Sequence, residues 1–255
     1  MSASASKAPV LSIDLTRCAQ WVAKVSSVII ALGIVREIVI GRIGLDTPLK
    51  ELRHIALDAE LSLPAFYSAV LILAIGVTLM VIGRAVRRTG GVDARQWMIL
   101  GAIFCLMAID EAASFHESLM MPLRNAFNLT GMFYYSWVIP GAIAVALIGA
   151  YYVPFLLRLP RRTAVLFAMA GGAYVGGALG MELVGGAFEN AIGKDTVAYS
   201  VAIVIEEGLE IVGLTLFFYA LTDHIARSWS SVGLSFSART VAVKGLALDR
   251  AAPAE

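Results

Sequence analysis

Residues 61–86 read LSLPAFYSAVLILAIGVTLMVIGRAV, and this stretch has no charged residue before Arg84. A helix that crosses the hydrocarbon core of a bilayer needs about 20 predominantly apolar residues. The stretch is long enough, and it is predicted to be a transmembrane helix. Comparable apolar windows occur at about 21–45, 96–120, 132–157, 163–188 and 197–222. We therefore predict an all-α integral membrane bundle of six transmembrane helices.

The composition of the whole chain agrees with a membrane protein. Its 255 residues are 59% hydrophobic and 15% charged, which is outside the usual range of soluble domains. The formal net charge of +1 excludes a broadly basic nucleic-acid-binding protein. The lipid bilayer is the expected partner, and association with other membrane subunits stays open.

The distribution of lysine and arginine predicts the orientation, because loops that remain in the cytoplasm are enriched in both. Most of these residues fall in the N-terminal segment, in two alternate connections and in the tail. They are Lys7, Arg17, Lys24, Arg84, Arg87, Arg88, Arg95, Arg158, Arg161, Arg162, Arg227, Arg239, Lys244 and Arg250. Both termini are predicted to be cytoplasmic, with an N-terminal segment 1–20, a transmembrane domain 21–222 and a tail 223–255.

The connections carry weaker signals. Thr47 and Pro48 form a helix-start signal, so a short helix at the outer interface is one expectation and a simple loop is the other. Tyr134, Tyr135 and Trp137 are placed where an interfacial aromatic belt is expected. His224 is predicted to be a solvated residue at the cytoplasmic end.

Nine acidic residues lie inside the apolar windows or at their edges. They are Glu37, Glu60, Asp110, Glu111, Glu117, Glu182, Glu206, Glu207 and Glu210. Each ionised carboxylate near a bilayer centre costs about 2.5 to 3.5 kcal/mol, so these side chains are expected to face the interior of the bundle. Arg36 is the internal base that can form an ion pair with them. This shortage of positive charge is the main functional indication in the sequence.

Helical geometry predicts that the acids converge. At 1.5 Å per residue, acids from four helices lie about 9 to 13 Å below the outer ends of their windows. Asp110 and Glu117 are seven residues apart and would share one face of a continuous helix. Glycines at 172, 176 and 180 form a stripe that a neighbouring helix can approach closely, which would position Glu182.

Carboxylates and a histidine from several antiparallel helices are typical of bundles that hold two metal ions. The candidate ligands are Asp110, Glu111, His116, Glu117, Glu182, Glu206, Glu207 and Glu210, with Glu37, His54 and Glu60 as further candidates. Soluble di-iron bundles carry two Glu-x-x-His pairs, whereas His116 is the one histidine in this cluster. We predict a divalent cofactor, with iron, manganese and zinc all compatible with the donors.

The predicted function is redox or metal-assisted chemistry at a site for one or two metal ions in the outer half of the bilayer. Such a protein could be a membrane metalloenzyme, either a di-iron-like oxidoreductase or a metal-dependent hydrolase, and the sequence assigns no catalytic residue. Two alternatives stay open. One is a proton- or cation-coupled transporter that uses the carboxylates as carriers. The other is a structural or accessory membrane subunit.

The order of the acidic motifs also carries a resemblance. Asp-Glu-x4-His-Glu at 110–117, Glu182 after a glycine-rich segment, and Glu-Glu-x-x-Glu at 206–210 resemble an uncharacterised group of bacterial multi-pass membrane proteins. The resemblance covers the third to sixth windows. It implies a bacterial inner membrane, with the outer end of the cluster toward the periplasm, and it implies no activity.

Overall fold

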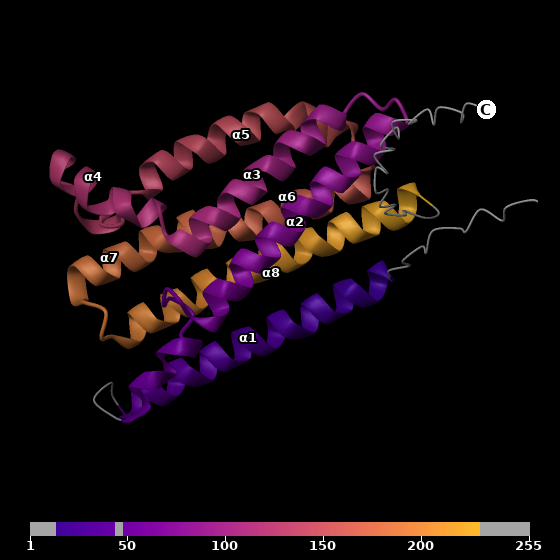
Figure 1. Ribbon diagram of the computed structural model, residues 1–255. Helices are drawn as coiled ribbons and strands as arrows, with labels where there is room; N and C mark the ends of the chain where they lie inside the picture. Colours follow the sequence, from indigo (N-terminus) through magenta and orange to yellow (C-terminus); the bar gives the residue numbers. More distant parts are fainter. Residues whose placement is uncertain (1–13, 44–47, 230–255) are drawn as a thin grey trace, which may run out of the picture.

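The computed structural model describes residues 14–43 and 48–229, and within these ranges it contains helices and no strand. The longest helices run roughly parallel or antiparallel to one another (Figure 1). The α-helices are α1 (Leu15–Ile43), α2 (Leu63–Arg88), α3 (Ala94–Ala113), α4 (Met120–Phe127), α5 (Val138–Arg158), α6 (Arg161–Val175), α7 (Glu182–Ile192) and α8 (Val197–Ser228). Four short segments join them, namely η1 (Pro48–Ile55), η2 (His116–Leu119), η3 (Gly131–Phe133) and η4 (Gly176–Met181). The all-α prediction is confirmed.

Four helices in the described ranges are long and apolar enough to cross a membrane. They are α2, α3, α5 and the continuous helix Arg161–Ile192, which comprises α6, η4 and α7. The helices α1 and α8 are also long, with 29 and 32 residues. The predicted tail at 223–255 begins inside α8, and residues 230–255 lie outside the described part of the chain.

Local signals explain where several elements begin. Ser62 caps α2 by accepting a hydrogen bond from the backbone N–H of Ala65 at 3.2 Å, and Pro64 follows in the first turn. Thr196 caps α8 in the same way through the N–H of Tyr199 at 3.3 Å. The segment η1 begins at Pro48, which agrees with the prediction of a short helix there, although Thr47 lies outside the described residues.

Tight aromatic and aliphatic packing fills one end of the bundle. Trp97 is 2% exposed and makes edge contacts with Phe155 and Phe167 at ring-centroid distances of 5.0 and 5.9 Å. His224 stacks on Trp97 at 5.1 Å and hydrogen-bonds Thr163, so the prediction of a solvated His224 is wrong. The start of α1 and the end of α8 lie at this same end (Figure 1, right).

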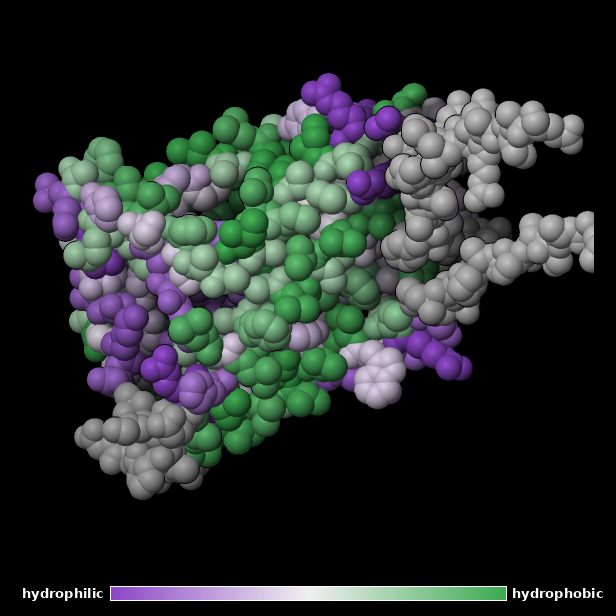
Figure 2. All heavy atoms as spheres, viewed as in Figure 1, coloured by the Kyte–Doolittle hydropathy of each residue, from purple (hydrophilic) through white to green (hydrophobic). Residues whose placement is uncertain are grey.

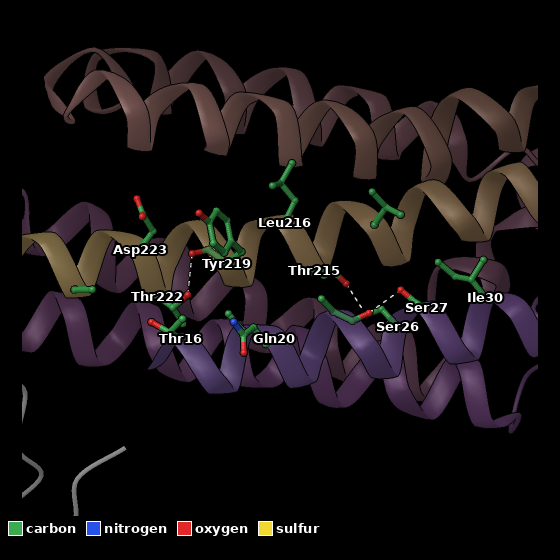
Figure 3. Close-up of a pocket in the computed structure, with 14 residues that line it drawn as sticks. Thr16, Gln20, Ser26, Ser27, Ile30, Thr215, Leu216, Tyr219, Thr222 and Asp223 are labelled. Carbon is green, nitrogen blue, oxygen red and sulfur yellow. Dashed lines mark hydrogen bonds between the residues drawn. The ribbon is translucent and has the colours of Figure 1, made fainter. Parts of the chain in front are cut away.

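The helix α1 packs mainly along α8. Ser26 hydrogen-bonds Thr215 of α8 at 2.6 Å and Tyr67 of α2 at 2.7 Å. Figure 3 shows Ser26 and Thr215 facing each other across the two helices, beside a pocket of about 600 Å³. The hydroxyl groups satisfy one another inside the bundle, which stabilises the α1–α8 contact where apolar packing alone is weak in lipid.

The third predicted window is interrupted. The helix α3 ends at Ala113, and Ser114 adopts a left-handed conformation with φ of 49°. The carboxylate of Asp110 accepts hydrogen bonds from the backbone N–H of His116 at 3.0 Å and from its Nδ1 at 2.8 Å, and so stabilises the break. The expectation that Asp110 and Glu117 share one face of a continuous helix is therefore wrong.

The fifth window contains a π-helical turn, η4, directly before Glu182. The extra residue in such a turn shifts the register of the helix, and π-turns are frequent at functional sites. Gly177 lies against α8, where an added Cβ would be 2.6 Å from the carbonyl oxygen of Glu206. A Cβ at Gly172, Gly176 or Gly180 would meet nothing within 4 Å, so the close approach uses a different glycine from the predicted stripe.

Candidate functional site

A cavity of about 1050 Å³ lies between α2, α3, α5, η4 and α8, at the end opposite the aromatic core. All eight main candidate ligands line it, as do His54 and Glu60. The set is Asp110, Glu111, His116, Glu117, Glu182, Glu206, Glu207 and Glu210. Hydrophilic side chains gather at this end of the molecule, and hydrophobic side chains cover most of the middle (Figure 2). The acids from separate helices are therefore brought to one space.

The helix α8 supplies three carboxylates from little more than one turn. Glu206 is the most buried, with 7% of its surface exposed, and its Oε2 atom has no hydrogen-bond partner. Glu207 and Glu210 are half-buried and also line the cavity. A buried carboxylate oxygen without a partner costs free energy.

Glu182 lies at the junction of η4 and α7, and its carboxyl approaches that of Glu206. Trp137 donates a hydrogen bond from Nε1 to Glu182 Oε1 at 2.7 Å. The Trp137 ring also contacts His116 at a centroid distance of 4.5 Å. Trp137 thus belongs to the cavity wall, and its prediction as an interfacial belt residue is corrected.

The side of the cavity near η2 carries a carboxyl pair. Glu60 and Glu117 share a hydrogen bond, and Ser114 also contacts Glu60. Desolvation, followed by the hydrogen bond and the charge of Glu60, raises the pKa of Glu117 to about 7. The hydrogen bond with Glu117 holds the pKa of Glu60 below its usual range. The pair therefore holds one proton between two carboxyl groups.

Asp58, Tyr199 and Lys194 also line the cavity, although none was a predicted site residue. Burial, followed by the charge of Glu37, raises the pKa of the Asp58 carboxyl. Lys194 lies 3.3 Å from a carboxylate oxygen of Glu189. The sequence does not single them out, because Asp58 and Lys194 fall in connections outside the apolar windows and Tyr199 resembles an ordinary residue at a helix start.

Tyrosine hydroxyl groups connect the segment after η3 with α7 and α8. Tyr135 hydrogen-bonds Glu189, and it also lies 3.0 Å from the hydroxyl of Tyr199. Burial is the largest cause that raises the pKa of Tyr135, so its hydroxyl stays protonated at neutral pH. Tyr135 therefore turns inward instead of forming part of an outer aromatic belt.

Arg36 and Glu37 do not line the cavity. Arg36 forms an ion pair with Glu37, its neighbour on α1, and both side chains are largely buried. The structure therefore pairs the internal arginine with one acid outside the cavity, and its charge also acts on Asp58 of the cavity wall. Among the described lining residues, Lys194 is the one lysine or arginine.

The carboxylates surround the cavity instead of converging on one point. Within the described residues, no three His, Cys, Asp or Glu side chains lie close enough together to hold one metal ion as they are oriented. Like charges in surroundings of low dielectric repel one another strongly, which favours this spread. The donors are oxygen-rich with imidazole nitrogen nearby, a set that suits hard or intermediate divalent cations.

Comparison with known proteins assigns the chain to a family. It belongs to the family described as Domain of unknown function (DUF8692), whose model matches residues 24–225. The match covers every element of the cavity wall. No curated protein and no solved structure matches the sequence.

Proposed function

We propose that this protein is a six-helix membrane protein whose cavity binds one or two divalent metal ions for redox or metal-assisted chemistry. In this proposal α1 and α8 cross the bilayer together with the four apolar spans. Both termini are cytoplasmic, the membrane is a bacterial inner membrane, and the cavity lies in its outer half. The concentration of arginine at the end that contains the aromatic core supports this orientation.

The observation that carries the proposal is the unbalanced charge of the cavity. Nine carboxyl side chains line it against Lys194 among the described residues. They are Asp58, Glu60, Asp110, Glu111, Glu117, Glu182, Glu206, Glu207 and Glu210. Protons can neutralise some of them, as in the Glu60–Glu117 pair, but the unpartnered Oε2 of Glu206 still needs a partner. A divalent cation supplies the missing charge at a low cost in volume.

The residues best placed to hold such ions come from four elements, α3, η2, α7 and α8. Glu207 and Glu210 of α8 and Glu111 of α3 line the cavity together, and Glu182, Glu206 and His116 lie on the side near Trp137. Glutamate side chains are long, so rotation of a few of them can bring their oxygens onto one ion. When bound, the metal would act as a Lewis acid or as a redox centre.

Neighbouring side chains hold two of the proposed metal ligands in place through hydrogen bonds. Asp110 holds the His116 ring through Nδ1, which leaves Nε2 as the nitrogen available to a ligand. Trp137 holds Glu182 through an indole N–H. Hydrogen bonds of this kind to metal ligands orient them and are typical of metal centres.

Elemental analysis of the purified protein in lipid nanodiscs tests the proposal. We expect about one or two metal ions per chain, and the replacements Glu111→Ala, Glu182→Ala and Glu207→Ala should each lose metal. Asp93→Asn is the matched control, because Asp93 pairs with Arg158 at the other end of the bundle. A folded, metal-free protein whose thermal stability does not change on addition of manganese, iron or zinc would contradict the proposal.

A cation- or proton-coupled transporter is the second candidate, and the Glu60–Glu117 pair favours it because that pair holds an exchangeable proton. Against it, the aromatic and aliphatic core around Trp97 and Phe155 fills the opposite half of the bundle. Cation-driven flux in liposomes that Glu207→Ala abolishes would favour the transporter. A structural subunit should show neither flux nor metal retention.

A further inference from the structure

The cavity wall is acidic at one end and apolar at the other. On α3, Met107 and Ile103 lie on the same face as Asp110 and Glu111, about one and two turns deeper in the bundle. On α5, the lining residues Gly141, Ala144, Val145 and Ile148 have the spacing of a single helix face and carry no charge. One cavity therefore offers carboxylates at one end and a hydrocarbon-lined groove at the other.

The helix α5 contacts the bundle near its two ends. Val138 is buried near its start, and Tyr152 and Phe155 are buried near its end. Between them, residues 142–151 are all exposed. Val145 and Ile148 are 37% and 36% exposed although they line the cavity. The middle of α5 thus stands away from α3, and the groove between them opens to the side of the bundle.

The two ends of this groove differ in chemistry. Beyond Ile148, α5 continues to the buried Tyr152, whose hydroxyl donates to the backbone carbonyl of Gln96 at 3.0 Å, and to the buried ring of Phe155. The outer end of the groove leads to the carboxylates and to the unpartnered Oε2 of Glu206. A molecule that fills the whole space must be apolar over about 10 Å, the rise from Gly141 to Ile148, and polar beyond it.

We infer that the cavity takes a bilayer amphiphile with a long apolar chain and a cationic head, which enters sideways between α3 and α5. The chain lies against Ile103, Met107 and the Ala144–Ile148 face, and the head lies among the carboxylates. Charge complementarity selects the head, because the wall carries nine carboxyl side chains against Lys194 and repels an anionic head. The inference deepens the proposed function, and it rests on that proposal in treating the cavity as a functional site.

Photo-crosslinking in phosphatidylcholine nanodiscs tests the inference. The probe is hexadecylamine with a diazirine in the middle of its chain, and matched hexadecanol and hexadecanoic acid probes report on the head. We expect the amine probe to label peptides that contain Ile103, Met107 and Val145, about tenfold more than the alcohol and more again than the acid. Equal labelling by all three probes would overturn the cationic head.

Two variants on α5 test the entry route. Ala144→Trp places a large ring in the groove and should reduce labelling by the amine probe about tenfold. Ala146→Trp is the matched control, since Ala146 is exposed and does not line the cavity, and it should leave labelling unchanged. Labelling that Ala144→Trp does not reduce, or that falls mainly on the lipid-facing Leu106 and Leu147, would overturn the groove.

The same measurement separates this inference from the metal site. Labelling is carried out with and without a chelator, because a bound metal ion would compete with the amine for the same carboxylates. If elemental analysis shows no metal and the labelling pattern holds, the metal-based function fails and the amphiphile site stands. If metal is retained and the three probes label equally, the amphiphile site fails and the metal proposal stands.

Discussion

The contact between η4 and α8 predicts that alanine lowers stability at Gly177 and raises it slightly at the adjacent Gly176. Gly177→Ala would place its Cβ 2.6 Å from the Glu206 carbonyl oxygen and 2.8 Å from the Glu210 Cγ. The nearest atom belongs to the backbone, so it cannot rotate away. Restoring ordinary contact requires the two helices to separate by several tenths of an ångström, and overpacking of this kind costs about 1 to 3 kcal/mol. The adjacent Gly176→Ala would meet nothing within 4 Å, and it should stabilise the helix by about 0.5 to 1 kcal/mol.

Thermal unfolding in nanodiscs, followed by circular dichroism, measures both effects. For a chain of this size, 1 kcal/mol corresponds to roughly 2 to 4 °C in Tm. We expect Gly177→Ala to lower Tm by about 2 to 12 °C, and Gly176→Ala to leave it unchanged or raise it slightly. Gly177→Ala should also weaken metal binding, because it displaces the backbone that carries Glu206 and Glu210. The reverse order of stabilities would mean that the helix lacks the π-turn register, and the reasoning would be refuted.

Three further replacements probe the cavity. Glu117→Gln should flatten the pH dependence of Tm: in the parent the folded state holds a proton that the unfolded chain loses above pH 4.5, so stability falls as pH rises from about 4.5 to about 7. Asp110→Asn should weaken the bond to His116 Nδ1 and lower stability by about 1 to 2 kcal/mol, with a shift of the His116 ring signals in NMR spectra. Trp137→Phe removes the hydrogen bond to Glu182 and should lower metal affinity about tenfold, measured by competition with a chelator.

Matched variants control these measurements. Asp195→Asn removes an exposed carboxylate outside the cavity and should keep the pH profile of the parent. Trp21→Phe alters a tryptophan that is 65% exposed on α1 and should keep the parent metal affinity. If Glu117→Gln keeps the pH dependence of Tm of the parent, the shared proton is contradicted. If Trp137→Phe keeps the metal affinity of the parent, the hydrogen bond from Trp137 to Glu182 has no role in metal binding.

The sequence predicted the cavity because ionised groups are costly in an apolar helix. Glu111, Glu182 and Glu207 had to face inward, and the structure places all three on one cavity. The cost of an ionised side chain in an apolar helix depends on composition and helix length. The prediction that these acids face inward therefore holds even where the helix boundaries differ by a few residues.

The sequence did not predict the two interruptions that shape the site. The helical wheel assumes an unbroken helix, whereas Ser114 leaves the helical conformation and η4 shifts the register by about one residue. Both changes involve tertiary contacts, with Asp110 bonding across the first break and Gly177 meeting α8 within the second. The inward orientation of Trp137 was missed for a related reason, because aromatic residues at a membrane interface are assigned by composition and not by their partners.

The exposed middle of α5 has a mechanical consequence. Buried residues anchor α5 near both ends, whereas residues 142–151 are exposed, so few side-chain contacts oppose bending of its middle section. Pro154, near the supported end, lacks the N–H that would bond the carbonyl of Ala150, which makes bending there easier. We therefore expect the width of the groove to depend on what surrounds α5. The cavity should differ in shape between detergent micelles and a lipid bilayer.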